Sequence, residues 1–454
     1  MSTRGAWSSK AGFILAGAGS AVGLGNIWRF PYMTGDNGGA VFVLLFLICC
    51  FLIGYPVMIA ELSLGRSSGR NPVGMFKKLS GERSAWKAVG VLCVLSGFAI
   101  FSWYSVILGW VVGYLAKTVT GTFSAQLTNE EIDTVFSTFG NNAPLVVFLH
   151  ALMIAVTALV VSGGVKSGIE KLSKWLMPLL FLLLILLAVR SVTLEGASAG
   201  LSFYLYPDFS KVSGSMILQA MGQALFSLSL GMGTMITYGS YLSRKENIPT
   251  SAAWILSFDV LVSILAGFVI LPAVAAMNQS YAQGPELIFK VLPSIFSSMP
   301  FGYFFGIGFF LLLIIAGLTS TVSILEVPVS FFVDERRWSR KRSVVLVAVG
   351  AWLIGTPAAL SSGASEFFSQ IPGLALSFFA LISTLFGDIS LSIGAFFISI
   401  FVAWKWGLGN AESEIEAEGN SFRIKGLWGF IVRYVAPTLI LIVFLYTVWS
   451  SALF

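Results

Sequence analysis

Residues 17–31 read Gly-Ala-Gly-Ser-Ala-Val-Gly-Leu-Gly-Asn-Ile-Trp-Arg-Phe-Pro and lie within an apolar run long enough to cross a membrane. A second such run contains residues 227–241, Ser-Leu-Ser-Leu-Gly-Met-Gly-Thr-Met-Ile-Thr-Tyr-Gly-Ser-Tyr. Each glycine lowers helix stability by about 1 kcal/mol, so glycines clustered beside Ser, Asn and Thr predict a break in each helix. Backbone groups freed inside a bilayer are tolerated only where they line a cavity or bind something. Freed carbonyls suit Na⁺, and the N-terminal ends of half-helices suit a carboxylate.

The two interrupted stretches lie at corresponding positions in the two halves of the chain. They belong to the first and the sixth apolar run, and this spacing fits two repeats of five helices. Interrupted segments at matching positions of two repeats indicate the binding site of a transporter. Close packing of helices through small residues is the alternative for either stretch taken alone.

Composition places most of the chain in lipid. The 454 residues are 56% hydrophobic and 11% charged, with a mean hydropathy of +0.88, whereas soluble proteins carry about 25% charged residues. A membrane-spanning helix needs about 20 apolar residues, and the chain contains eleven apolar runs. They lie near residues 11–33, 39–65, 86–117, 144–162, 168–190, 214–241, 251–277, 301–333, 343–360, 374–404 and 427–450. We therefore expect an all-α polytopic membrane protein with 11 transmembrane helices, of which helices 1 and 6 are discontinuous.

One transmembrane domain, residues 1–454, accounts for all the runs: a first repeat over about 11–190, an inverted second repeat over about 214–404, and an extra helix at 427–450. With the N-terminus inside, the inner segments hold 21 of the 27 Lys and Arg residues, as cytoplasmic loops do. We expect a multi-pass protein of the inner (plasma) membrane with its N-terminus in the cytoplasm and its C-terminus outside. The interrupted first run is not the pattern of a cleavable signal peptide.

The residues that enzymes and metal sites use are scarce. The single histidine, His150, opens an apolar run, and Cys49, Cys50 and Cys93 lie inside such runs without a C-x-x-C motif. This pattern favours neither a disulfide framework nor a metal site, and we expect no catalytic residues. The net charge of +6 comes from short loops, so it indicates a bilayer rather than a nucleic-acid partner.

Residues 19–31 resemble the first-helix signature of the neurotransmitter:sodium symporter family. Further matching segments are Asn37-Gly-Gly, Glu61-Leu-Ser-Leu-Gly-Arg66, Tyr104 to Trp110, Gln223 to Gly233, Ile-Thr-Tyr-Gly-Ser-Tyr241 and Ala316-Gly-Leu-Thr-Ser320. The resemblance runs from about residue 4 to residue 405. It implies the leucine-transporter fold of the eleven-helix bacterial type. It also implies sodium-coupled symport of hydrophobic, including aromatic, L-amino acids by alternating access.

The resemblance implies two bound sodium ions and assigns their ligands. Sodium site 2 would consist of Gly19, Val22, Ala316, Thr319 and Ser320. Sodium site 1 would consist of Ala21, Asn26, Ser227 and Asp259. Carbonyl, hydroxyl and carboxylate oxygens are the ligands that hard cations prefer. For Thr319 and Ser320, hydrogen bonds back to their own helix are the alternative.

Asp259 is an intramembrane carboxylate, which is costly unless it is paired or liganded. Chloride-dependent members of the family hold chloride with a Tyr, a Gln and two Ser. The matching positions here are Phe46, Gln223, Ser227 and Ser263, so the Tyr is missing. The resemblance therefore implies that Asp259 supplies the negative charge and that chloride is dispensable. A structural bond from Asp259 to a neighbouring helix is the alternative.

The implied substrate site is apolar and uncharged. It consists of Ala21, Leu24, Gly25, Ile100, Tyr104, Phe226, Ser227, Ser229, Met232, Ser320 and Ile324. The amides of Leu24 and Gly25 and the Tyr104 hydroxyl would bind the substrate carboxylate. Gly23 stands where amine-transporting members carry an aspartate, which implies an α-amino acid, and Met232 would adapt to side chains of several sizes. Helix packing is the alternative for each apolar residue.

The resemblance also implies gates. Arg4 and Asp334 would close the inner side, with Trp7 and Tyr241 beside them, although plain cytoplasmic positive charge also explains Arg4. At the outer side the family pairs the residue matching Arg29 with an Asp of the tenth helix. Ser383 stands at that position and Asp388 lies about one turn further on, so the partner of Arg29 stays open.

Gly168 and Pro178 resemble the family's Gly-x9-Pro element, which unwinds the start of the fifth helix to admit water. Glycine permits unwinding, and proline removes a backbone donor. Simple helix capping is the alternative.

Three other functions compete with symport. A channel is disfavoured because mid-helix breaks around a closed apolar pocket suggest binding rather than a continuous pore. A membrane enzyme is disfavoured by the single histidine. A non-transporting amino-acid sensor stays open. The expected partners are a small amino acid, sodium and the lipid bilayer.

Overall fold

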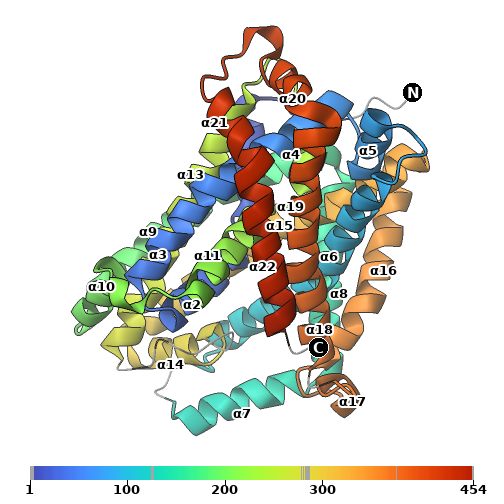
Figure 1. Cartoon of the computed structure of the whole chain (residues 1–454). Coiled ribbons are helices and arrows are strands. Elements are labelled where there is room, and N and C mark those ends of the chain that lie inside the picture. Colours follow the sequence, from blue (N-terminus) through green and yellow to red (C-terminus); the bar gives the residue numbers. More distant parts are fainter. Residues whose placement is uncertain are drawn as a thin grey trace.

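The computed structural model describes residues 5–123, 127–277, 279, 281, 287–374 and 376–451. Within these ranges the chain forms helices and no strands. Among the described residues, nine helices are long and apolar enough to cross a membrane, or ten if one bent pair counts as a single span. The helices form one elongated bundle, and the two chain ends lie at its opposite ends (Figure 1).

The nine long helices correspond to nine of the eleven predicted runs. Several are built from segments that join without interruption. They are α3–η2–α4 (Ala40–Cys49, Cys50–Gly54 and Tyr55–Ser68), α6 (Lys87–Val119), α8 (Ala143–Ser162), η3–α9 (Val165–Glu170 and Lys171–Val192), α13 (Ile248–Ala276), α15 (Gly302–Glu335), α16 (Arg340–Leu360), α18–η6–α19–η7–α20 (Phe378–Ser383, Thr384–Ile389, Ser390–Ile400, Phe401–Gly407 and Leu408–Ile415) and α21–η9–α22 (Lys425–Phe430, Ile431–Val435 and Ala436–Ser450).

The first predicted run is a broken helix, as expected from its glycines. α1 (Lys10–Ala21) ends in the extended residue Val22, and the chain resumes as η1 (Gly25–Arg29) and α2 (Phe30–Asp36), bent by 50° from α1. The Ser9 side chain caps the start of α1 by accepting a hydrogen bond from Gly12. A helix interrupted at residues 22–23 therefore lies within the bundle.

The run at 214–241 is also broken. It forms α11 (Gly214–Ser227) and α12 (Thr234–Gly239), separated by the non-helical residues 228–233. Gly231 and Gly233 have φ of +83° and +78°, and Ser229 has φ of +54°. Backbone with positive φ is accessible to glycine but strained for serine. These two short helices are the pieces of the predicted sixth span.

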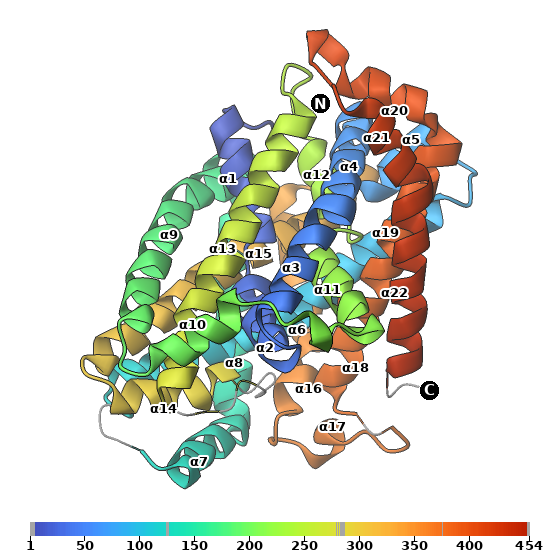
Figure 2. The same cartoon turned by 60° about the vertical axis from the view of Figure 1, so that its left-hand side comes forward.

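The broken segments are enclosed by long helices. α1 packs against α13, α15 and α9, α12 packs against α4, and α11 packs against α3. α6 and α15, the two longest uninterrupted helices, lie against each other in the middle of the bundle. Figure 2 shows α1, α13 and α15 on one side of the interior and α3, α11 and α12 on the other.

Short helices cover the two ends of the bundle. α7 (Asn129–Gly140), α14 (Val291–Ser298) and α17 (Glu366–Ser369) lie at one end, and α5 (Pro72–Ser80) lies at the other with α20 (Figure 1). α10 (Ala197–Leu205) packs on α13, and the single turns η4 (Phe209–Lys211) and η8 (Ala417–Gly419) complete the helices. α7 and α14 lie in residues 118–143 and 278–300, the stretches between predicted apolar runs.

A candidate binding centre at the two broken helices

Asn26, Ser227 and Asp259 form one buried polar cluster between η1, α11 and α13. The Asn26 amide donates to Asp259 Oδ1 at 2.7 Å and to Ser227 Oγ at 2.9 Å. The Ser227 hydroxyl lies 2.9 Å from each oxygen of Asp259. Asn26 and Asp259 have no exposed surface. Buried carboxylates are stabilised by such hydrogen bonds, so this cluster concentrates negative charge beside the broken backbone of the first helix.

Two residues that the resemblance matches to chloride ligands, Ser263 and Gln223, contact η1. Ser263 accepts from the Asn26 amide at 2.9 Å, and Gln223 donates to the Gly25 carbonyl at 2.9 Å. Phe46, which the resemblance matches to the Tyr of chloride-dependent members, packs on Phe30 with ring centroids 4.8 Å apart. An aromatic ring without a hydroxyl therefore occupies this position.

A second group of oxygens lies where α1 ends against α15. The Ser320 hydroxyl lies 3.0 Å from the Val22 carbonyl and 3.4 Å from the Gly19 carbonyl. Thr319 instead bonds back to its own helix, at 3.0 Å from the Ala316 carbonyl. A Cβ on Gly19 would lie 3.1 Å from the Thr319 side chain. The five residues of the predicted sodium site 2 therefore lie together at this point.

A small cavity lies between the two breaks. Its volume is about 20 Å³, which is close to what one water molecule needs. It is lined by Ser20, Ala21, Gly23, Gly25, Ile100, Tyr104, Phe226, Ser227, Ser229, Met232, Ser320, Ile324 and Leu391. This set contains every predicted substrate residue except Leu24, whose backbone N–H donates to the Tyr104 hydroxyl at 2.7 Å. An amino acid enters this space only if the flexible side chains around it shift outward.

Two glycines allow aromatic residues to approach the broken backbone. A Cβ on Gly23 would lie 2.7 Å from the Tyr104 hydroxyl and 2.5 Å from Ser320 Oγ. A Cβ on Gly25 would lie 2.9 Å from the Phe226 ring. Both distances are shorter than van der Waals contact, so a larger residue at either position would close the cavity.

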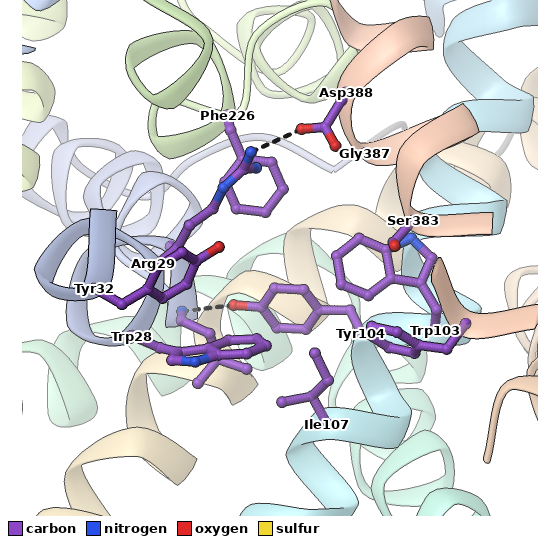
Figure 3. A pocket seen from close by; sticks show the side chains of 13 residues that line it. Trp28, Arg29, Tyr32, Trp103, Tyr104, Ile107, Phe226, Ser383, Gly387 and Asp388 are labelled. Carbon is purple, nitrogen blue, oxygen red and sulfur yellow. Dashed lines mark hydrogen bonds and ion pairs between the residues drawn. The ribbon is translucent and has the colours of Figure 1, made fainter. Parts of the chain in front are cut away.

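The side of the cavity that the sequence predicts to face outward is closed by Tyr104 and Phe226. Both also line a larger space of about 170 Å³ on the side of Arg29 and Asp388. In Figure 3 the Arg29 side chain passes across the Phe226 ring to reach Asp388. The guanidinium carbon lies 4.7 Å from the ring centroid, and an Arg29 nitrogen lies 2.8 Å from the Asp388 carboxylate.

Asp388, rather than the residue at position 383, is therefore the partner of Arg29. Asp388 lies in η6, which is a π-helical segment. A π-helix has more residues per turn than an α-helix. Ser383 lines the same space but bonds to the Ala380 carbonyl of its own helix. The acidic group of this gate is thus displaced along the helix.

An aromatic cluster lies on the opposite side, which the sequence predicts to face the cytoplasm. The Trp7 indole donates to the Tyr238 carbonyl at 3.1 Å, and its ring lies 6.3 Å from that of Tyr241. Asp334 accepts from the Asn71 backbone at 2.9 Å. Arg4, the predicted partner of Asp334, lies outside the described residues.

A buried ion pair supports this inner cluster, and sequence reasoning missed it. Both oxygens of Glu326, which has no exposed surface, are bound by Arg340, with the shorter contact at 2.5 Å. The Tyr241 hydroxyl donates to the same carboxylate at 2.7 Å. A carboxylate inside a predicted span is itself a signal of function, and Glu326 interrupts an apolar run.

Glu61 is a second carboxylate of this kind. It has no exposed surface and accepts a hydrogen bond from the Gly231 amide at 2.7 Å. It therefore binds an amide that is free because residues 228–233 are not helical. Its position inside the predicted run at 39–65 was the available signal.

The start of the fifth predicted run, which forms η3 and α9, is helical in this structure. Gly168 lies in η3, and Pro178 lies inside α9. Glu170, which sequence reasoning also missed, accepts from the Ser8 backbone at 2.8 Å and from Lys174 at 2.7 Å. This contact connects the chain before α1 to the Gly168–Pro178 segment.

Oxygen atoms of the backbone, hydroxyls and one carboxylate dominate the centre. In the part of the chain that the structure describes, no three His, Cys, Asp or Glu side chains gather as a metal site. The donor set fits sodium, a hard cation that binds oxygen ligands, and the free amides fit a carboxylate.

Comparison with known proteins matches this geometry to one family over nearly the whole chain. A sequence model described as the sodium:neurotransmitter symporter family matches residues 4–138 and 131–452. The uncharacterised sodium-dependent transporter YhdH of Bacillus subtilis (strain 168) is 38% identical over 97% of this chain and 96% of its own length. The sodium-dependent serotonin transporter of Drosophila melanogaster is 30% identical over 98% of this chain and 76% of its own length. The crystal structure of MhsT in complex with L-phenylalanine superposes with a TM-score of 0.90, at 43% identity, over 98% of this chain and 100% of that one.

Proposed function

Since the chain belongs to the sodium:neurotransmitter symporter family, whose members are transporters and not enzymes, we propose that it imports hydrophobic, including aromatic, L-amino acids together with sodium. The observation that carries this proposal is that two non-helical backbone segments, residues 22–23 and 228–233, meet at one buried cavity. MhsT, the structural relative at 43% identity, was solved with L-phenylalanine bound. An α-amino acid has the two charges that free amides and free carbonyls bind.

The chemistry of the cavity supports a hydrophobic substrate. Its side-chain lining includes Ile100, Met232, Ile324 and Leu391 and carries no charged group. Such a lining favours apolar side chains over charged ones. Because Gly23 leaves the first-helix end of the cavity without a carboxylate, the substrate has to supply its own.

We assign one sodium ion to each oxygen cluster. Sodium site 1 uses Asp259, Asn26, Ser227 and the Ala21 carbonyl, and sodium site 2 uses the Gly19, Val22 and Ala316 carbonyls with Thr319 and Ser320. The buried Asp259 carboxylate offsets the charge of the first ion. We further propose that this carboxylate makes chloride unnecessary, since it already supplies the negative charge that chloride would bring.

The closed contacts on both sides of the cavity support transport by alternating access. Tyr104, Phe226 and the Arg29–Asp388 pair close the outer side, and Trp7 with the Tyr241–Glu326–Arg340 contacts closes the inner side. Sodium and substrate would favour this occluded conformer because they bind it more tightly than the open ones. Release to the inside would begin with loss of the Ser8–Glu170 contact and unwinding between Gly168 and Pro178.

The proposed architecture has eleven spans. The broken helices α1–α2 and α11–α12 would each count as one span and would begin two inverted five-helix repeats, over about 11–190 and 214–404. The N-terminus would face the cytoplasm and the C-terminus the outside of the plasma membrane. The opposite positions of the two chain ends support an odd number of spans (Figure 1).

Uptake into proteoliposomes tests the function. The purified chain is reconstituted, a sodium gradient is imposed, and uptake of labelled amino acids of each side-chain class is measured, with potassium replacing sodium as the control. We expect saturable accumulation of Phe, Trp, Leu or Met that ends when an ionophore collapses the gradient. Accumulation that is equal in potassium, or that is confined to charged amino acids, would contradict the proposal.

A further inference from the structure

A deep apolar groove lies on the flank of the bundle, away from the substrate cavity. Its volume is about 350 Å³, and side chains of α5, α6, α15 and α16 line it with no polar group. Val91 and Leu95 of α6 are 42% and 51% exposed, and Leu346 of α16 is 45% exposed. The groove is therefore open toward the surroundings of the bundle, which in this segment are lipid.

Gly350 lines the groove and leaves room for the neighbouring Phe98 ring. A Cβ on Gly350 would lie 3.2 Å from the tip of the Phe98 ring, so a larger residue would press on that ring. α6 and α16 lie side by side here, with α5 above them (Figure 1). A space of this shape between two helices fits a hydrocarbon chain.

The mouth of the groove is basic on both helices. Lys87 precedes Val91 and Leu95 at i, i+4 and i+8 on α6, and Arg342 precedes Leu346 and Gly350 at the same spacing on α16. Residues four apart lie on one helix face, so each cation continues the face that lines the groove. Both helices begin at the end that the basic residues predict to be cytoplasmic.

Aromatic contacts hold one of these cations at the mouth. The Arg342 guanidinium lies 4.2 Å from the centre of the Trp338 ring. Trp338 stacks at 5.2 Å on Phe332, which lines the groove. Tryptophan at this depth is typical of the membrane–water interface.

Among the described residues, the cations at the mouth of the groove have no carboxylate partner. Within the described part of the chain, neither Lys87 nor Arg342 forms an ion pair with an acidic residue. Glu335, at the end of α15, is bound instead by Lys77 of α5. Lys87 and Arg342, at the mouth of the apolar groove, therefore have no acidic partner among the described residues.

We propose that this groove binds an anionic phospholipid of the cytoplasmic leaflet, with an acyl chain between α6 and α16 and the headgroup phosphate between Lys87 and Arg342. Basic pockets between membrane helices on the cytoplasmic side bind anionic headgroups. The lipid would brace α6, which carries Tyr104, against α15, which carries Thr319 and Ser320.

Photo-crosslinking tests the proposal on the full-length protein in nanodiscs. Phosphatidylglycerol with a photoactivatable acyl chain competes with unlabelled phosphatidylglycerol or phosphatidylcholine, and the crosslinked peptides are mapped. We expect crosslinks in residues 87–98 and 342–350, displaced far better by phosphatidylglycerol. Equal displacement by the two lipids, or crosslinks spread evenly over the bundle surface, would overturn the proposal.

Two variants separate the headgroup from the acyl chain. Each cation near a bilayer surface contributes about a fivefold gain in affinity for anionic lipid, so the double variant K87Q/R342Q should lose most of the lipid preference. Its matched control, R83Q/K341Q, removes two neighbouring exposed cations and should keep that preference. Equal loss in both double variants would overturn the proposal.

Leu346→Trp should fill the groove and remove the crosslinks to both lipids. Its control is Leu353→Trp, which changes a 59% exposed residue of the same helix and should leave them in place. Unchanged crosslinking in L346W would overturn the assignment of the acyl chain. Wild-type competition between the two lipids decides the headgroup preference even if a variant fails to fold.

Discussion

Asp259→Asn is the substitution that most sharply tests the sodium assignment. It keeps the size of the side chain and removes a charge that is wholly buried. Asp259 accepts hydrogen bonds from Asn26 at 2.7 Å and from Ser227 at 2.9 Å, and an amide in its place would direct N–H groups toward some of these donors. Sodium site 1 would then consist of neutral groups only.

The expected loss follows from the burial of this charge. Removing one partner of a buried ion pair costs about 3–5 kcal/mol. At about 1.4 kcal/mol per factor of ten, the sodium concentration for half-maximal uptake should rise at least about 100-fold. The measurement is the sodium dependence of amino-acid uptake into proteoliposomes, at a fixed substrate concentration.

The control is Ser251→Ala on the same helix, α13. Its hydroxyl is buried and has no hydrogen-bond partner in the described structure, so its removal should change the sodium dependence less than about threefold, as expected for a distant site that is not coupled to Asp259. If D259N kept a wild-type sodium dependence, the assignment of Asp259 to sodium would be wrong.

The same position tests the role of chloride. Wild-type uptake should be unchanged when gluconate replaces chloride, because Asp259 already carries the negative charge. Asp259→Ser should gain a dependence on chloride, because it opens space and removes that charge. Complete loss of wild-type uptake in gluconate would contradict this account.

Three further substitutions test the gates and the second break. Asp388→Asn should loosen the outer gate by about 1 kcal/mol, the upper range for a partly exposed pair with Arg29, seen as about fivefold faster labelling of a vestibule cysteine. Tyr241→Phe removes a hydrogen bond to the buried Glu326 carboxylate, worth about 1.5–3 kcal/mol, and should raise the inward-open population about tenfold or more in spin-label distance distributions. Gly231→Ala places a Cβ 2.1 Å from a carbonyl of α19 at φ +83°, and should lower the thermal unfolding temperature and abolish substrate binding.

Matched controls accompany these three variants. Ser383→Ala lies in the same vestibule as Asp388 but outside the ion pair, so its labelling rate should stay at the wild-type value. Tyr303→Phe removes an exposed tyrosine hydroxyl that bonds to Val119, and should leave the inward-open population unchanged. Gly222→Ala meets only one side-chain atom, at 3.9 Å, and should keep wild-type stability. Equal effects in control and test variants would contradict the corresponding contact.

The breaks in two helices were predictable because their cause is local. Glycines beside polar residues weaken a helix wherever it lies, and residues 22–23 and 228–233 are the segments that leave helical geometry in these two runs. Asp259 was found because it matches a sodium-ligand position of the family, whereas Glu61 and Glu326, which also stand inside apolar runs, were given no role. Membership of the family was also predictable from the signature at 19–31, and it is confirmed by the match over nearly the whole chain.

The displaced outer gate was not predictable from an alignment. Ser383 and Asp388 are five residues apart, and only the π-helical turn of η6 shows which of them reaches Arg29. The pairing of Glu326 with Arg340 and Tyr241 was missed for a related reason. These residues come from α15, α16 and the turn that follows α12, and only the packing of those helices brings them together. Long-range partners depend on helix packing rather than on local sequence.

Equilibrium binding of a labelled aromatic amino acid to the purified protein tests most directly whether free backbone groups at the two breaks bind the substrate. We predict that the labelled amino acid binds in sodium but not in potassium. The unlabelled amino acid should displace it, but its methyl ester and the matching decarboxylated amine should not. Equal binding in potassium, or full displacement by the amine, would contradict this prediction.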